Sequence, residues 1–178
     1  MSQSIDLAQS TNHSLDALML DPIAPETRQQ LLRFPLTAQD SALLPLEQIT
    51  EILRIEVAEI LPIPETSGYV LGVCNWRGEM LWLIDLNDFV GYVSPFQPEQ
   101  MPDSLTVMVV QIANQTLGIG VQQVNDIELH DLQRLQQAVP GLFPTRFLPF
   151  ILGMLPGCSD AVLDIQAIVQ SPLWTSQL

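Results

Sequence analysis

The chain has 178 residues, with 20 acidic side chains, 6 arginines, no lysine and a formal net charge of −14. Contacts to phosphate need clustered cations, so this balance argues against a nucleic-acid-binding protein and against a surface that docks on anionic lipid. Apolar residues make up 47% of the sequence, enough for the core of one ordinary domain. The sequence contains no run of about 18 apolar residues, so no membrane span is predicted.

The first 27 residues differ in composition from the rest of the chain. Residues 1–11 are rich in Ser and Gln, and either Asn12 or Ser14 could cap a short helix. We therefore expect residues 1–27 to be an N-terminal extension that is partly disordered or forms a short helix. This segment lacks the basic and apolar pattern of a leader, so no signal peptide is predicted.

From residue 28 onward the pattern predicts many short strands, because short runs of strand-favouring residues alternate with turn signals. The predicted strands are residues 31–36, 42–46, 49–53, 69–76, 80–84, 105–112, 117–121, 150–155 and 161–163. The run 105–112 is almost wholly apolar and β-branched, which predicts a strand buried on both faces. No strand–helix–strand rhythm appears, so the fold class is all-β, with a small barrel architecture and a few short helices.

Two short helices are predicted in the last third of the chain. Residues 128–138 carry a leucine at every third position, and Pro140 and Gly141 end that pattern. Residues 165–169 form the second.

A short internal repeat points to two similar β subdomains. Leu83-Ile84-Asp85-Leu86 and Val162-Leu163-Asp164-Ile165 share one pattern, apolar, apolar, Asp, apolar. Each is predicted to end a strand and open a helical turn. We assign Asp85 and Asp164 to capping, since a carboxylate accepts hydrogen bonds from the free N–H groups of the new turn.

Motifs for catalysis or metal binding are scarce. Residues 157–161 approach a nucleophile motif but lack its last glycine, and they are read as a surface turn. His13 and His130 are far apart, and neither has a partner at zinc-like spacing, so no metal and no cofactor are predicted. His130 is read as solvated. A small β-barrel hydrolase that uses scattered acids stays a weaker alternative.

The two cysteines, Cys74 and Cys158, are predicted to be free and buried. Free cysteines without a disulfide fit a reducing cytoplasm, so a cytoplasmic location is expected.

One segment places a lone arginine at a hairpin tip. Residues 69–76 and 80–84 are predicted to pair, with Arg77-Gly78-Glu79 as the turn. The planar guanidinium of Arg77 could pair with carboxylates on a partner protein. The other reading is an ion pair within the chain, to Glu79 or to a nearby acid.

This segment resembles the signature of the CheW family, the adaptor proteins of bacterial chemotaxis arrays. The signature stands here as Gly72-Val73-Cys74-Asn75-Trp76-Arg77-Gly78, followed at the family's spacing by Ile84-Asp85-Leu86. Residues 44–52, 118–127, 152–153 and 162–164 resemble the flanking elements, so the resemblance covers about residues 28–171. Residues 172–178 are left as a C-terminal tail. Trp76 replaces the usual leucine, and Gln122 replaces a common aspartate.

The resemblance implies two small SH3-like five-stranded β-barrel subdomains packed together, and a role without catalysis. That role is to couple a methyl-accepting chemo- or photoreceptor to a CheA-type histidine kinase, in a two-component taxis or twitching-motility pathway. The expected partners are the receptor's cytoplasmic tip and the kinase, which would recruit the protein to membrane-bound arrays. An interaction barrel of a different regulatory system is the alternative.

The resemblance also carries a set of partner-binding residues to this chain. Arg77 matches the family arginine associated with receptor and kinase coupling. Ile49, Glu51 and Gly72 match positions near the contact surfaces. Asn75 and Gly78 are expected to shape the hairpin, with Gly78 where the backbone needs positive φ or a close approach.

Overall fold

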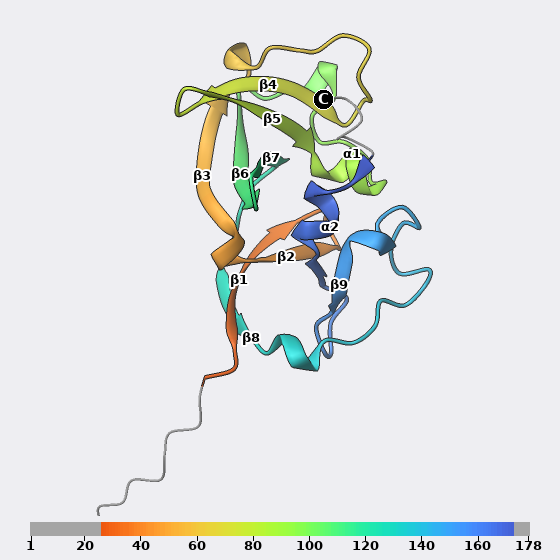
Figure 1. The fold of residues 1–178 in the computed structure, drawn as a ribbon. Coiled ribbons are helices and arrows are strands. Elements are labelled where there is room, and N and C mark those ends of the chain that lie inside the picture. Colours follow the sequence, from red (N-terminus) through yellow and green to blue (C-terminus); the bar gives the residue numbers. More distant parts are fainter. Residues whose placement is uncertain (1–25, 173–178) are drawn as a thin grey trace, which may run out of the picture.

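In the computed structural model, which describes residues 26–172, ten strands form two five-stranded sheets (Figure 1). The helix expected near Asn12 and the tail beyond residue 172 lie outside this range. Within it, no helix combines the length and the apolar character needed to cross a membrane.

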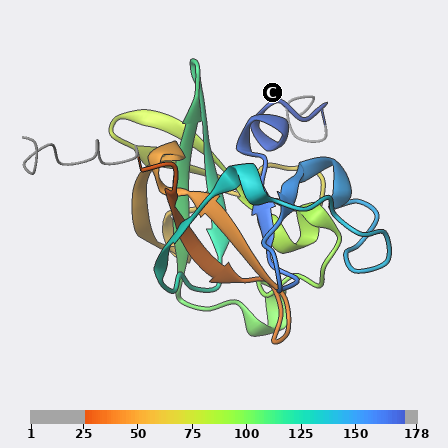
Figure 2. The ribbon, with the colours of Figure 1, turned by 90° about the horizontal axis from the view of Figure 1, so that it is seen from below.

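The first sheet is built from both ends of the described chain. Its strand order is β8-β1-β2-β10-β9. The bounds are β1 Gln29–Pro35, β2 Ser41–Pro45, β8 Ile127–His130, β9 Ile151–Met154 and β10 Ala161–Leu163. Strand β2 runs parallel to β10, so N-terminal (orange) and C-terminal (blue) segments lie side by side (Figure 2).

The second sheet is continuous in sequence and has the strand order β3-β6-β7-β5-β4. The bounds are β3 Ile49–Glu56, β4 Val70–Trp76, β5 Glu79–Asp85, β6 Ser104–Ile112 and β7 Gln115–Val121. The chain thus leaves the first sheet after β2, completes the second, and returns.

Each sheet closes on itself by the same device. In the second sheet, the chain beyond β3 turns back, and Leu61 exchanges two backbone hydrogen bonds with Val73 of β4, of 2.8 and 2.9 Å. In the first sheet, the chain beyond β8 does likewise through Gln136 and Met154 of β9, at 2.9 and 2.7 Å. These bridges bring the outer strands together, so we call the two units the first barrel and the second barrel.

Glycines make room for both closures. Gly72 precedes Val73 and has φ +134°, and a Cβ there would overlap the carbonyl oxygen of Leu61. Gly153 precedes Met154, and a Cβ there would lie 2.8 Å from the Cβ of Leu135. A side chain at either position would push the closing segment away.

The internal repeat marks equivalent places in the two barrels. Strand β5 leads into helix α1 (Leu86–Val90), and β10 leads into α2 (Ile165–Val169). Asp85 caps α1 by accepting from the N–H of Asp88 at 3.3 Å, and Asp164 caps α2 by accepting from Ala167 at 2.9 Å. Burial of Asp85, which is 1% exposed, raises the pKa of its carboxyl.

Five short 3-10 helices complete the described elements. They are η2 Leu46–Gln48, η3 Val57–Glu59, η4 Pro98–Gln100, η5 Leu132–Arg134 and η6 Leu148–Phe150.

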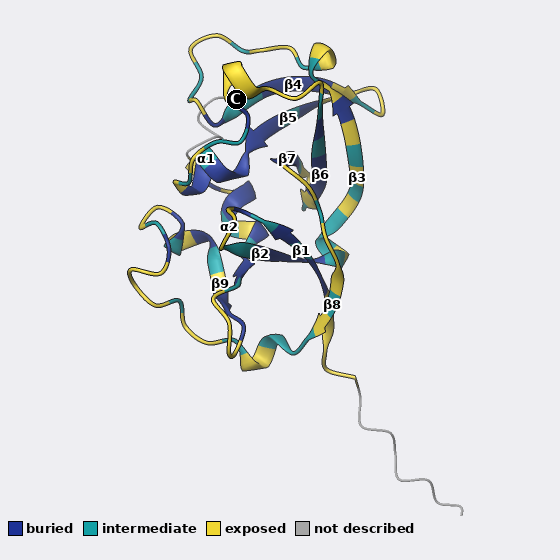
Figure 3. Ribbon diagram, turned by 180° about the vertical axis from the view of Figure 1, so that it is seen from behind, coloured by how far each residue is buried: buried dark blue, intermediate teal, exposed yellow. Residues whose placement is uncertain are grey.

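The hydrophobic core has three parts, and the largest joins the two barrels. That cluster takes residues from both sheets, and α1 and α2 lie within it between the barrels (Figures 1 and 3). The other two fill the barrel interiors. Strand β6 serves two clusters, with Val107 and Val109 inside the second barrel and Met108 and Val110 facing the first. The prediction of a strand buried on both faces is confirmed.

The helix predicted over residues 128–138 is wrong. Residues 127–130 form β8, and only η5 follows it. A leucine at every third residue is compatible with a helix. Instead, all four residues of β8 pair with the antiparallel segment Gln29 to Leu32 of β1. Backbone pairing supplied by a distant strand outweighs such a weak local pattern.

Candidate partner-binding site at the Arg77 hairpin

The β4–β5 hairpin turns on two residues, Arg77 and Gly78, between the paired Trp76 and Glu79. Their φ values are +53° and +82°, as a type I′ turn requires. The positive φ expected at Gly78 is confirmed, and Arg77 shares it. The side chain of Asn75 accepts a hydrogen bond from the Gly78 N–H at 3.1 Å, which ties the turn together.

Arg77 is both exposed and paired. Its side chain is 62% exposed, and its Nη2 lies 2.9 Å from Oε2 of Glu51. Its guanidinium carbon lies 4.7 Å from the centre of the Trp76 ring, within range of a cation–π contact. The ion pair within the chain therefore exists, with Glu51 and not with Glu79. Exposed pairs of this kind contribute only about 0.2–1 kcal/mol.

Trp76 completes this cluster. Its indole N–H donates to the same Oε2 of Glu51 at 3.0 Å, while its ring packs against the core of the second barrel. Glu51 lies on β3 and Trp76 on β4, the two outer strands that closure of the barrel brings together. We call Glu51, Trp76 and Arg77 the hairpin cluster.

The other predicted site residues have positions of their own. Ile49 begins β3, is half-buried and packs against the cluster between the barrels. Gly72 is buried within the closure of the second barrel and offers no side chain to a partner. Asn75 and Gly78 are exposed beside Arg77. The structure thus brings Glu51, Asn75 and Gly78 to Arg77, and leaves Ile49 and Gly72 in the supporting framework.

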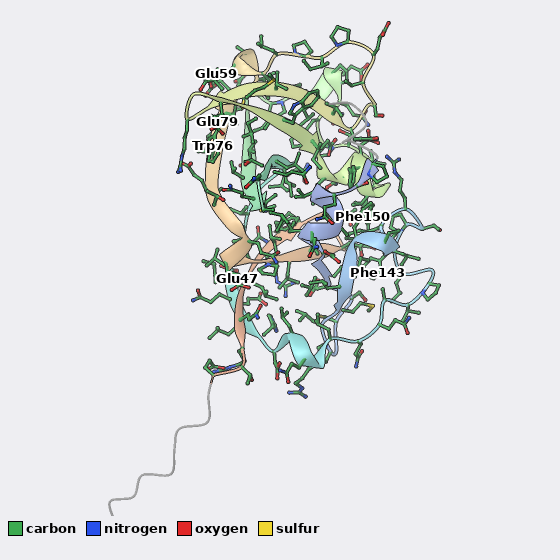
Figure 4. The ribbon with its side chains drawn as sticks, viewed as in Figure 1. Glu47, Glu59, Trp76, Glu79, Phe143 and Phe150 are labelled. Carbon is green, nitrogen blue, oxygen red and sulfur yellow. The ribbon has the colours of Figure 1, made fainter. Side chains whose placement is uncertain are left out.

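Exposed apolar and acidic side chains lie on the hairpin itself and on the segment that bridges to its strand β4. Met80 is 68% exposed and Leu61 is 65% exposed. Glu59 and Glu79 are exposed as well (Figure 4), and within residues 26–172 neither makes an ion pair. This rim therefore combines one guanidinium, apolar side chains and carboxylates, a mixture typical of protein interfaces.

A network of ion pairs lies in the first barrel. Arg33 on β1 contacts both carboxylate oxygens of Glu128 on β8, at 2.7 and 3.0 Å, and Asp160 at 2.6 Å. Glu128 also lies 2.7 Å from Nε2 of His130. Arg33, then His130, lowers the pKa of Glu128 to about 2. His130 is thus part of this network and half-buried, which corrects its reading as a solvated residue.

One cysteine prediction is also wrong. Both thiols are free, and Cys74 is buried, but Cys158 is exposed. It lies in the turn after Pro156 and Gly157, where the chain reverses before β10.

The described residues assemble no site for acid–base chemistry. The carboxyls with displaced pKa values, Glu26, Asp85 and Glu128, serve ion pairs or a helix cap. A pocket of about 340 Å³ beside β6 is lined by Arg54, Ser104 and Thr106 among others, with no acid in its wall. Among the described residues, no three side chains are placed to hold a metal ion.

Two joined β-barrels with a charged and apolar rim are an arrangement that suits the binding of other proteins. The comparisons agree: a family model for the CheW-like domain matches residues 30–173. The chain belongs to the CheW-like domain family.

A solved structure supports the same fold. The scaffolding protein TtCheW from Thermoanaerobacter tengcongensis superposes with a TM-score of 0.63 at 20% sequence identity, covering 77% of this chain and 89% of that one. No curated protein matched the sequence. The CheW-like domain family consists of non-catalytic adaptors, so this chain is a non-catalytic chemotaxis signalling adaptor, and the hydrolase alternative is set aside.

Sequence reasoning treated Trp76 only as a departure from the family pattern. Its link to Glu51 joins residues 25 positions apart, and only the closure of the barrel brings them together. The indole N–H was the one available signal, since a partly buried tryptophan usually finds an acceptor.

Proposed function

We propose that this adaptor couples a methyl-accepting receptor to a CheA-type histidine kinase, in a two-component taxis or twitching-motility pathway. The observation that supports it is the hairpin cluster, which holds an exposed guanidinium beside a two-residue turn at the rim of the second barrel. The partners would recruit the protein, from the cytoplasm, to membrane-bound receptor arrays.

Modest contacts are sufficient for such a role. An interface of about 800 Å² per partner or less gives reversible binding, and an array repeats it many times. Neighbouring contacts then raise the effective concentration of each partner. A signal passes if the adaptor's contacts differ between the active and inactive arrangements of the kinase.

Replacement of Arg77 tests this proposal. Arg77→Glu reverses the charge at the rim, and we expect binding to the receptor's cytoplasmic tip and to the kinase's regulatory domain to weaken about tenfold or more. Binding would be measured by titration calorimetry with purified partners. The unfolding midpoint should change little, because the side chain is 62% exposed.

The matched control is Arg54→Glu, which changes an exposed arginine of β3 in the same barrel. It should leave both affinities within about threefold of wild type. Equal losses in the two variants, or none in Arg77→Glu, would remove Arg77 from the site. If the wild-type protein bound neither partner, the chain would instead be an interaction barrel of another regulatory system.

A further inference from the structure

The second barrel has an open pocket between the β3–β6 pair and the loop that precedes β6. Its volume is about 340 Å³, and small-molecule sites in proteins commonly have about 300–1,000 Å³. The wall combines a guanidinium, two hydroxyls, two amides and an aromatic ring, supplied by Arg54, Ser104, Thr106, Gln100, Gln122 and Phe96 among others. We call it the β6 pocket. No carboxylate belongs to its wall, although the chain has a net charge of −14.

Strand pairing brings the polar side chains together. Arg54 of β3 is paired with Thr106 of β6, and Thr106 is paired with Val121 of β7, which Gln122 follows. The Nε of Arg54 donates to Oγ of Ser104 at 2.6 Å, so the guanidinium is held across the neighbouring strand. The pocket is therefore built by the sheet itself and not by one loop.

The apolar part of the pocket is also well supported. Phe96 is only 6% exposed and packs in the core of the second barrel, where Leu105 and Val107 lie as well. A ligand in the pocket would thus meet a fixed aromatic side chain on one side and the arginine on another.

Arg54 has donors to spare. Within residues 26–172 its two Nη atoms make no hydrogen bond, and the arginine forms no ion pair. These two atoms carry four N–H groups in a planar fork, which suits a carboxylate that approaches from solvent. In the same range the side chains of Thr106 and Gln122 make no hydrogen bond either, so they can add further contacts.

Gln122 keeps negative charge out of the wall. The family pattern commonly has aspartate here, and this chain has an uncharged amide. An aspartate at this position would stand in the same pocket as Arg54, where it would attract the guanidinium and repel an anionic ligand. With glutamine, the positive charge of Arg54 is left for a group from outside.

Negative charges lie beside the pocket instead. Glu99 precedes the wall residue Gln100, Asp103 precedes Ser104, and Glu56 is paired with Ser104. All three acids are exposed, and within residues 26–172 none of them forms an ion pair. A ligand with one negative and one positive group fits this arrangement, whereas a phosphate or a dicarboxylate would be repelled by the three acids.

We propose that the β6 pocket binds a free α-amino acid with an apolar side chain. Its carboxylate pairs with the Nη atoms of Arg54, its ammonium group is attracted by the acids beside the pocket, and its side chain lies towards Phe96. This inference goes beyond the proposed function, because the pocket shares no residue with the hairpin cluster and its ligand needs neither receptor nor kinase.

The first test is a titration of the full-length protein with L-phenylalanine and with L-leucine, followed by the NMR shifts of backbone amides. We expect saturable shifts at residues 104–106 and 122, with a Kd of about 1 mM or tighter for at least one of the two. Saturation with neither amino acid, or shifts confined to other parts of the chain, would overturn the proposal.

Two matched probes test the two charges of the ligand. L-Phenylalaninamide has no carboxylate and should bind about tenfold or more weakly than L-phenylalanine, since it cannot pair with Arg54. 3-Phenylpropionate has no ammonium group and should bind about threefold or more weakly, since only exposed acids attract that group. Equal binding of either probe, or tighter binding of inorganic phosphate, would overturn the assignment to an amino acid.

Variants of the wall test the site itself. Arg54→Gln and Gln122→Asp should each weaken binding of L-phenylalanine about tenfold or more. The control is Gln111→Asp, which adds the same charge at an exposed position of β6 outside the wall and should change the Kd less than about twofold. Equal weakening by the two aspartates would mean that only the net charge matters, and it would overturn the proposal.

Failure of this inference and failure of the proposed function give different results. Arg54→Glu should lose the amino acid and still bind the receptor tip and the kinase domain. A wild-type protein that bound both partners but no amino acid would overturn only the β6 pocket. One that bound the amino acid and neither partner would overturn only the proposed function.

Discussion

Among the described residues, Arg33 is the arginine that forms ion pairs with two acidic side chains. It joins β1 to Glu128 on β8 and to Asp160 in the turn before β10, so three distant segments meet at one guanidinium. Its side chain is 21% exposed, and bidentate pairing at that burial is worth more than a surface ion pair.

The stability of the first barrel should therefore depend on pH. The pKa of Glu128 is about 2 in the folded chain, against an ordinary 4.5, so its contribution is complete above pH 4.5 and is lost as the pH falls towards 2. Glu128→Gln should lower the free energy of unfolding by about 1–3 kcal/mol at neutral pH. Near pH 2, where the carboxyl of Glu128 is largely protonated, the same change should lower it only a little. Urea titrations at both pH values measure this.

An exposed acid provides the control for that prediction. Glu99 on η4 is exposed and makes no ion pair within residues 26–172. Glu99→Gln should change stability by less than about 0.5 kcal/mol at either pH. A Glu128→Gln difference that did not depend on pH would contradict the assignment.

At the scale of elements, the two barrel closures depend on glycine. Gly72→Ala would place a methyl group against the Leu61 carbonyl at φ +134°, and we expect a loss of about 2–4 kcal/mol in unfolding free energy. Gly157→Ala is the matched control, since φ there is +81° but no atom lies within 4 Å of the added Cβ. It should cost only about 1 kcal/mol. Similar losses in both variants would mean that closure tolerates the methyl group.

The helix caps are a second feature at this scale. Asp164→Ala removes the acceptor for the Ala167 N–H and should cost about 1 kcal/mol in thermal or urea unfolding. Asp164→Ser, which keeps an acceptor, should recover most of that loss. If serine were no better than alanine, the carboxylate would be acting through something other than the cap.

The elements that sequence predicted well are those with local causes. Strand β6 is an apolar and β-branched run in its own sequence, and Gly78 lies in a tight turn between two strand-like runs. Asp85 and Asp164 each follow a strand and precede a helical turn. The errors concern distant contacts. Strand β8 forms because β1 is beside it, and Glu51 meets Arg77 because the chain at Leu61 folds back onto Val73. No pattern within a short stretch of sequence predicts the pairing of β8 with β1 or the closure of Leu61 onto Val73.

At the scale of the whole molecule, the shared cluster makes the two barrels one folding unit. Phe147, from the first barrel's long loop, is fully buried against Phe143 and against Tyr92 of the second barrel, with ring centres 5.6 and 6.0 Å apart. Tyr92 in turn donates to Asp40, at the tip of the β1–β2 hairpin, at 3.1 Å.

Loss of that packing should weaken both barrels together. Phe147→Ala should lower the free energy of unfolding by about 3–5 kcal/mol while unfolding remains a single transition. Tryptophan fluorescence and far-ultraviolet circular dichroism should report the same midpoint. Two separate midpoints in the variant would mean that the barrels fold independently.

The threading of the chain through the two barrels has a consequence for its synthesis. A ribosome releases β1 and β2 first, yet β10, the neighbour of β2, appears only after the entire second barrel. The strands of the second barrel can therefore pair while translation continues, but the core that they share with the first barrel stays incomplete, and the early hairpin has to wait with its apolar face uncovered. A chaperone that acts on this nascent protein would be needed most during that interval, because a chain that ended just after residue 121 would lack every C-terminal residue of the shared core.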